Sequence, residues 1–175
     1  MTTSVHNLPD AESLLNTLTS KLAAYIRPDT AIVGIHSGGA WIAEKITPLL
    51  RQSNPESELT LGVLDSSFYR DDYNQRGLHA ETRPSQIPFD VQDKHILLID
   101  DVFYTGRTIR AAMNELFDYG RPASITLAVL INRGGRELPI CPQVTALELE
   151  VPHHQKLQLS RDADNRLHFT LEENA

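Results

Sequence analysis

The chain has 175 residues, of which 41% are hydrophobic and 22% are charged, and its formal net charge at pH 7 is −7. This composition is ordinary for one globular domain, and the acidic balance argues against a protein that binds nucleic acid through broad electrostatic attraction. Cys141 is the single cysteine, and no apolar run approaches the roughly 20 residues of a membrane span. The N-terminal residues MTTSVHNLPD have no basic flank and no apolar signal core, so we expect a cytoplasmic protein without a membrane partner.

The N-terminal third alternates between helix and strand. Asp10 is typical of a helix N-cap, and leucines at helical spacing extend the predicted helix to about Ile26. Residues Ala31–Ile35 predict a short buried strand, and a turn of small residues, His36–Gly39, leads into a second helix over Ala40–Leu50. This order is typical of a strand and helix that pack on each other.

A long polar stretch interrupts this alternation. A strand is predicted over Leu59–Leu64, and residues Asp65–Pro88 then show no sustained period. A stretch of this length without regular structure is usually functional or disordered. We therefore interpret it as a mobile loop or a long hairpin arm.

The remaining elements resume the alternation. The apolar run His95–Ile99 predicts a strand buried on both faces, and Thr108–Tyr119 predicts a helix that Gly120 terminates. Strands follow over Ser124–Ile131 and Val144–Val151, separated by an Arg/Gly/Pro-rich loop over residues 132–142.

A terminal hairpin completes the chain. Gln155–Leu159 and Arg166–Leu171 are predicted to form its strands around a polar turn at residues 162–165. The whole pattern predicts an α/β fold with a mostly parallel central sheet flanked by helices. Such sheets bind ligands at the carboxyl ends of their strands.

The segment Ile96–Thr108, ILLIDDVFYTGRT, carries the chemistry. Its strand delivers Asp100 and Asp101 to the carboxyl edge, and Thr105–Thr108 opens a helix whose free N–H groups can bind a phosphate. The two carboxylates would repel a phosphate alone, but they suit the hydroxyls of a ribose or a bound Mg²⁺. The pattern therefore predicts a sugar-phosphate site.

Other classes of acidic strand end fit less well. P-loop nucleotide hydrolases also place acids after a strand, but the chain has no Gly-Lys-Ser/Thr motif. A response-regulator acidic pocket needs no Thr-Gly-Arg-Thr helix start directly behind its acids. A structural surface pair explains neither the turn nor the helix start.

The segment Ile96–Thr108 resembles the phosphoribosyl pyrophosphate (PRPP) signature of type I phosphoribosyltransferases. Gly120-Arg121-Pro122 and Leu127–Ile140 (LAVLINRGGRELPI) resemble specifically the PyrR family of pyrimidine operon regulators and uracil phosphoribosyltransferases, and Phe68–Asp72 is similar to that family's flexible arm. The resemblance covers roughly residues 10–150 and is strongest over 87–142. It implies the type I fold in one domain over residues 1–175, with an arm at about 65–88 and a small hood formed by about 132–142 and the terminal strands.

The resemblance also implies a role for each matched residue. Asp100 and Asp101 are expected to hold the ribose hydroxyls, directly or through Mg²⁺ and water, and Arg70 of the arm to act beside them as a catalytic residue. Ser37, Gly38 and Gly39 are expected to receive the pyrophosphate, and Ile131, Asn132 and Arg133 to face the base. The PRPP segment comprises Ile96, Leu97, Leu98, Ile99, Asp100, Asp101, Val102, Phe103, Tyr104, Thr105, Gly106, Arg107 and Thr108, of which Tyr104–Thr108 would bind the 5′-phosphate.

The expected partners are PRPP with Mg²⁺, uracil and its product UMP, and further copies of the chain in a homodimer or higher homo-oligomer. Tyr104 stands where purine-specific relatives commonly have an acid, which favours a pyrimidine; orotate, a purine and a purely regulatory role are the alternatives. RNA binding is less expected than catalysis, because residues 1–30 contain only Lys21 and Arg27 as basic residues and Glu148–Ser160 lacks a basic segment.

Overall fold

The computed structural model describes residues 8–66 and 84–173. Within those ranges, no helix is both long and apolar enough to cross a membrane. The helices and strands, in chain order, are α1 (Ala11–Leu22), η1 (Ala23–Tyr25), β1 (Thr30–Ile35), α2 (Gly38–Ser53), β2 (Thr60–Leu64), β3 (His95–Phe103), α4 (Arg107–Asp118), β4 (Ser124–Asn132), β5 (Val144–Glu148), β6 (Gln155–Arg161) and β7 (Leu167–Glu173).

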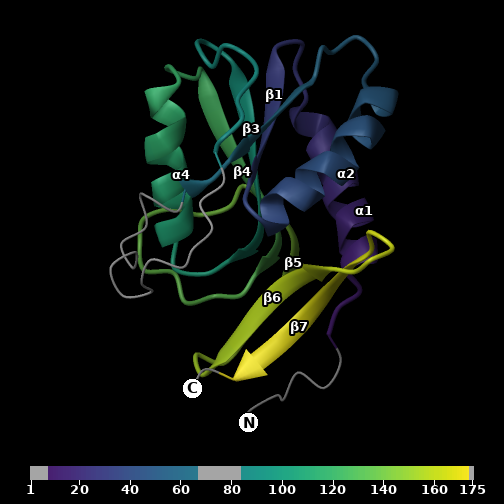
Figure 1. Ribbon diagram of the computed structural model, residues 1–175, viewed down its shortest axis with the longest axis vertical. Coiled ribbons are helices and arrows are strands. Elements are labelled where there is room, and N and C mark those ends of the chain that lie inside the picture. The colour runs from purple at the N-terminus through teal and green to yellow at the C-terminus, as the bar shows by residue number, and fades with distance from the viewer. Residues whose placement is uncertain (1–7, 67–83, 174–175) are drawn as a thin grey trace.

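A parallel sheet forms the centre of the molecule. Its strand order is β2-β1-β3-β4-β5, and every neighbouring pair is parallel. Figure 1 shows α1 and α2 on one side of this sheet and α4 on the other. The predicted α/β class with helices on both faces is confirmed.

The buried side chains separate into one core on each face of the sheet. On β3, Leu97 and Ile99 pack with α1 and α2, whereas Ile96 and Leu98 pack with α4. This alternation follows from the two-residue repeat of a strand, and it explains why β3 reads as a continuous apolar run.

Two strand boundaries differ from the prediction. Strand β3 does not end before the acidic pair but continues to Phe103, because β4 extends beside it and pairs Asp100 with Val129 and Phe103 with Asn132. Strand β5 ends at Glu148 rather than Val151, because its last partner on β4 is Asn132, the final residue of that strand. Backbone pairing to a neighbour decided both boundaries, and no local pattern reports it.

The second helix begins earlier than its hydrophobic pattern indicated. It starts at Gly38 rather than Ala40, so Gly38 and Gly39 form its first turn. Both glycines are pressed against β3: a Cβ on Gly39 would lie 2.2 Å from the Ile99 carbonyl oxygen. Glycine is therefore required there by close approach of the helix to the strand.

The terminal hairpin is confirmed and lies below the carboxyl edge of the sheet (Figure 1). Leu157, Leu159 and Phe169 belong to the same buried cluster as Leu15 and Leu18 of α1. A carboxylate oxygen of Glu12 also accepts from the Leu167 backbone N–H at 3.0 Å. The hairpin is thus fixed to the first helix by apolar packing and a hydrogen bond.

Most of the predicted arm, including Arg70, lies outside the described residues. Its base is described on both sides: Val63 pairs with Gln86 in an isolated antiparallel bridge. The Asp65 N–H donates to Ser85 Oγ at 2.8 Å, and that hydroxyl contacts Glu115 of α4.

Candidate active site at the carboxyl edge of the sheet

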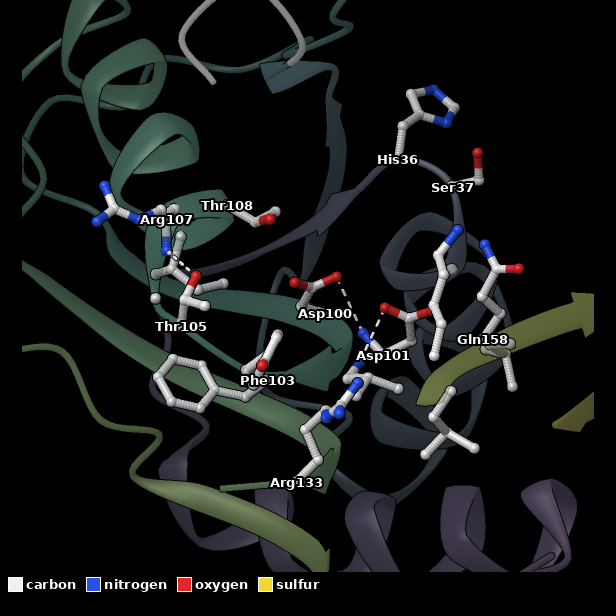
Figure 2. Close-up of a pocket in the computed structure, with 18 of the residues that line it drawn as sticks. His36, Ser37, Asp100, Asp101, Phe103, Thr105, Arg107, Thr108, Arg133 and Gln158 are labelled. Carbon is white, nitrogen blue, oxygen red and sulfur yellow. Dashed lines mark hydrogen bonds between the residues drawn. The ribbon is translucent and has the colours of Figure 1, made fainter. Parts of the chain in front are cut away.

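An open pocket of about 890 Å³ lies where β1 and β3 end. Its walls come from four parts of the chain: the turn after β1 with Trp41, residues 100–109, the loop residues Arg133 and Glu137, and residues 156–159 of β6. Figure 2 shows the acidic pair between the α4 start and the turn at His36 and Ser37. Segments far apart in sequence therefore meet in one cavity.

Two helices direct their N-termini to this pocket from opposite faces of the sheet. Helix α2 follows β1, and its first backbone bond joins the Trp41 N–H to the Ser37 carbonyl at 3.2 Å. Helix α4 follows β3, with Gly106 as its N-cap in a left-handed conformation at φ 94°. Neither N-cap residue makes a side-chain cap hydrogen bond, so first-turn N–H groups can bind an anion, apart from that of Arg107, which donates to the Thr105 hydroxyl.

Asp100 and Asp101 lie between these helix starts and are held in defined orientations. Asp100 is 6% exposed, and its Oδ1 accepts from the Asp101 N–H at 3.0 Å. The Oδ1 of Asp101 accepts from the Val102 N–H at 2.8 Å. Each carboxylate therefore has one oxygen bound to the backbone, and a carboxylate has further acceptor positions for ligand hydroxyls or hydrated metal.

The turn at Thr105–Thr108, which the sequence predicts to bind a phosphate, is stabilised by the loop after β4. Arg107 Nε and a carboxylate oxygen of Glu137 lie 2.9 Å apart, and the Glu137 N–H donates to the Thr105 carbonyl at 3.0 Å. The Thr105 hydroxyl accepts from the Arg107 N–H at 3.2 Å. The turn is thus shaped by its own hydroxyl and by a loop 30 residues away.

Arg133 is a buried cation at the lower side of the pocket. It is 6% exposed, and its Nη2 donates to the carbonyls of Val151, Pro152 and Gln155 at 3.3, 3.1 and 3.0 Å. Its guanidinium lies 4.1 Å from the centre of the Tyr104 ring. Burial lowers the pKa of Arg133, and the nearby Tyr104 acts in the opposite direction.

Tyr104 is oriented by a second contact. Its hydroxyl and His153 Nδ1 lie 2.9 Å apart. A Cβ on Gly135 would lie 2.4 Å from its ring. Tyr104 is therefore enclosed by the loop after β4 and by the connection that leads to β6.

The terminal hairpin supplies side chains that the sequence did not indicate. Lys156 and Gln158 of β6 line the pocket, and Figure 2 shows Gln158 beside Asp101. Trp41 also lines it, with the Arg161 guanidinium 4.9 Å from the centre of its ring. The available signal was weak: Lys156 and Gln158 are the polar members of an alternating strand, which indicates an outward face but not what it faces.

The predicted site residues fall into three groups. Those that line the pocket are Ser37, Gly38, Asp100, Asp101, Val102, Phe103, Tyr104, Thr105, Gly106, Arg107, Thr108 and Arg133. Those that do not line it are Gly39, Ile96, Leu97, Leu98, Ile99, Ile131 and Asn132. Residues 96–99 and Ile131 are buried in the sheet and support the site from beneath, and Arg70 is outside the described residues.

The described residues contain no group of three or more His, Cys, Asp or Glu side chains that could hold a metal ion by themselves. The pocket instead pairs two carboxylates with two helix starts, and a cation there would need ligands from a bound molecule or from water. This donor set fits Mg²⁺ carried with a polyphosphate, because Mg²⁺ commonly uses one or two carboxylates plus substrate phosphates.

Comparisons with known proteins agree with this geometry. The phosphoribosyl transferase domain family matches residues 1–155. A bifunctional protein PyrR from Nitrosococcus oceani is 48% identical over 148 residues, which is 85% of this chain and 82% of that protein. Another from Pseudomonas fluorescens is 43% identical over 165 residues, covering 92% and 95%.

Solved structures show the same fold at low sequence identity. A hypoxanthine phosphoribosyltransferase from Staphylococcus aureus has a TM-score of 0.59 at 19% identity, covering 86% of this chain and 83% of that one. The enzyme from Trypanosoma cruzi has a TM-score of 0.59 at 15% identity, covering 83% and 82%.

Proposed function

The chain belongs to the phosphoribosyl transferase family and, within it, to the bifunctional PyrR proteins, as its sequence predicted, and we propose that it transfers the phosphoribosyl group of PRPP to uracil, giving UMP and pyrophosphate. The observation that carries the proposal is the opposed pair of helix N-termini with two carboxylates between them, all in one pocket. The N-terminus of one helix can bind one phosphate group. Two helix N-termini with two carboxylates between them can therefore bind a sugar that has phosphate groups at both ends and hydroxyls in the middle.

PRPP fits the pocket in one orientation. The 5′-phosphate binds at Thr105–Thr108, where the turn is narrow and Gly106 allows close backbone approach. The ribose hydroxyls donate to Asp100 and Asp101. The pyrophosphate then reaches Ser37–Gly39 at the start of α2.

Mg²⁺ is the cofactor that this arrangement implies. It would be held by the pyrophosphate and ribose oxygens of PRPP, with Asp100 and Asp101 binding it through water. When bound, it neutralises charge on the departing pyrophosphate. The carboxylates themselves orient the sugar.

The reaction exchanges one bond at ribose C1. The C1–O bond to pyrophosphate breaks with its electron pair leaving on oxygen, and the C1–N1 bond to uracil forms as the base loses its N1 proton to solvent. Positive charge develops on the ribose in the transition state. Positioning of the two reactants and neutralisation of the leaving group supply the catalysis, so no covalent nucleophile is required.

The base lies towards Tyr104 and the loop after β4. Ile131 and Asn132 end β4 behind this space without lining the pocket, whereas Arg133 lines it and contacts Tyr104. The tyrosine has no charge to offer a purine ring, which supports a pyrimidine substrate. Arg70 on the arm acts on the pyrophosphate side.

Three further assignments accompany this function. The protein is one domain over residues 1–175, because the terminal hairpin shares its core cluster with α1. It acts in the cytoplasm. It forms a homodimer or a higher homo-oligomer, for which the 54% exposure of Phe117 on α4 offers an apolar contact.

The test is a PRPP-dependent assay with Mg²⁺ that offers uracil, orotate, hypoxanthine and adenine in parallel. We expect nucleotide and pyrophosphate from uracil alone, and removal of Mg²⁺ by a chelator should abolish both products. Turnover of another base in preference to uracil would overturn the substrate assignment. An Asp101→Asn variant with unchanged rate and unchanged PRPP affinity would overturn the role of the carboxylates.

A regulatory role is the second candidate, because the relatives are named bifunctional. In this case the pocket would sense PRPP or UMP and control pyrimidine genes. Measurable PRPP binding without turnover of any base would favour it over the enzyme.

A further inference from the structure

The pocket has an unequal distribution of positive charge between its two phosphate-binding ends. At the α4 end, Arg107 is present, although Glu137 at 2.9 Å offsets its charge. At the α2 end, the turn His36-Ser37-Gly38-Gly39 has no lysine or arginine. Pyrophosphate carries more negative charge than a phosphate monoester, so a cation from another part of the chain would add to the charge that Mg²⁺ and Arg70 bring to this end.

Strand β6 brings a lysine to the pocket. Lys156 lines it together with Ser37, Gly38 and Asp101. Arg133, the other cation in this wall, is committed through its Nη2 to three backbone carbonyls. No ion pair joins Lys156 to a carboxylate in the described part of the chain, so its ammonium can bind a ligand phosphate.

The neighbouring glutamine holds this ammonium in place. With its amide oriented so that both atoms have partners, Gln158 accepts from Lys156 Nζ at 2.7 Å and donates to the Glu172 carboxylate at 3.2 Å. Lys156 and Glu172 are also directly opposite in the β6–β7 ladder. Figure 2 shows the Gln158 side chain extending from β6 along Asp101, in the direction of Ser37. Gln158 therefore holds the lysine in the wall of the pocket, next to β7.

We propose that Lys156 binds the pyrophosphate group of PRPP and of the product, and that the terminal hairpin thereby completes the α2 end of the site. This inference rests on the proposed phosphoribosyl transfer. It adds a ligand-binding residue from β6, opposite the turn, to a site otherwise built from the carboxyl ends of β1 and β3. An ammonium hydrogen-bonded to a phosphate oxygen favours the charged leaving group in the transition state as well as in the bound substrate.

The experiment compares two ligands that occupy different parts of the site. Magnesium pyrophosphate occupies only the α2 end, whereas UMP has the base, the ribose and the 5′-phosphate but no pyrophosphate. Titration calorimetry at fixed ionic strength should show that Lys156→Gln weakens pyrophosphate binding by about tenfold or more, the usual effect of losing a charged hydrogen bond. UMP binding should change less than about twofold.

Two variants serve as controls. Lys156→Arg keeps the charge and should retain most of the pyrophosphate affinity. Lys94→Gln makes the same charge change just before β3, at the opposite end of the sheet, and should leave both affinities unchanged. Equal melting temperatures by circular dichroism would verify that each variant folds.

The outcomes separate this inference from the proposed function. If wild-type protein binds neither PRPP nor UMP, the proposed function fails. If wild-type protein binds both, but Lys156→Gln binds pyrophosphate as tightly as wild type, the inference alone is wrong. Equal losses of UMP and pyrophosphate affinity would also overturn it, because Lys156 would then support the hairpin rather than contact the leaving group.

Discussion

At the residue scale, Gly38 and Asp101 are in close contact in the pocket. A Cβ on Gly38 would lie 2.3 Å from Asp101 Oδ2 and 2.6 Å from its Cγ. The start of α2 and the acidic pair therefore set each other's position. Orientation of the ribose and binding of the pyrophosphate are linked through this contact.

We predict that Gly38→Ala lowers PRPP affinity by about tenfold, which corresponds to about 1.4 kcal/mol. The added methyl group must displace the Asp101 carboxylate or the first turn of α2. Calorimetric titration with PRPP and Mg²⁺ measures the loss. The same substitution in an Asp101→Ala background should cost much less, since most of the overlap is gone; additive losses would show that the effect does not run through Asp101.

Arg133 has a structural role that its sequence position did not reveal. Two of its three carbonyl partners belong to the connection between β5 and β6 and the third is Gln155, the first residue of β6; its guanidinium is stacked on Tyr104. It thus fixes the hairpin relative to the PRPP segment. If Arg133 contacts the base, it does so from a position that these carbonyls and Tyr104 already fix.

We expect Arg133→Met to lower the free energy of unfolding by about 2–4 kcal/mol, because buried carbonyls lose charged donors. Urea unfolding measures the change, and hydrogen exchange should show faster exchange of the β6 amides. Arg136→Met, an exposed change in the same loop, is the matched control. Equal stability of the two variants would mean that the carbonyls find other partners.

Individual residues were predictable where one continuous segment carried them. Residues 100–108 combine acids, hydroxyls and a glycine in an order that one strand and one helix start explain. Lys156 and Trp41 were not predictable in this way, because only the docking of the hairpin and the packing of α2 bring them to the pocket. Tertiary placement, not residue type, makes them part of the site.

At the scale of elements, periodicity predicted every strand of the sheet and the terminal hairpin. It failed at ends that depend on a neighbour: β3 continues through two aspartates because β4 pairs with Asp100, Val102 and Phe103, and α2 starts at glycines because the helix approaches β3 closely. Aspartates and glycines at these ends are typical of turns, so the sequence predicted a turn where the structure continues a strand or starts a helix. These residues are polar or small because they lie at the edge of the sheet that forms the candidate active site.

The base of the arm joins α4 through a titratable contact. Ser85 donates to the Glu115 carboxylate and accepts from the Asp65 N–H. Burial raises the pKa of Glu115 above its usual 4.5, with Asp65 and Asp118 acting in the same direction and the Ser85 hydrogen bond against it. At pH values between the unfolded and the folded pKa of Glu115, the folded protein therefore keeps a proton on this carboxyl that the unfolded chain has already released.

The sign of the pH dependence follows from this difference. Below the unfolded pKa both states are protonated and Glu115 costs nothing; as pH rises through the folded pKa, its ionisation in the folded state becomes unfavourable relative to the unfolded chain. We predict that Glu115→Gln gains stability relative to wild type as pH rises from about 4 to about 8, as measured by urea unfolding. A Glu115→Gln difference independent of pH would contradict the prediction.

At the scale of the whole molecule, the distribution of charge bears on whether the protein can bind RNA as a second function. The net charge is −7, and the first 30 residues have two basic side chains. Two of the pocket cations are engaged locally, Arg107 with Glu137 and Arg133 with backbone carbonyls. A surface that neutralises several RNA phosphates at once needs clustered lysine and arginine side chains.

We therefore predict that an RNA hairpin binds only at the non-specific level, with a dissociation constant weaker than about 10⁻⁶ M near physiological salt. Fluorescence anisotropy would compare a hairpin with a scrambled strand of equal length at low and moderate salt. Equal affinities and a shallow salt slope are expected, because few phosphates would release counterions. A hairpin bound more than about tenfold tighter than its scrambled control would reverse the conclusion, since that preference exceeds what unclustered charges can supply.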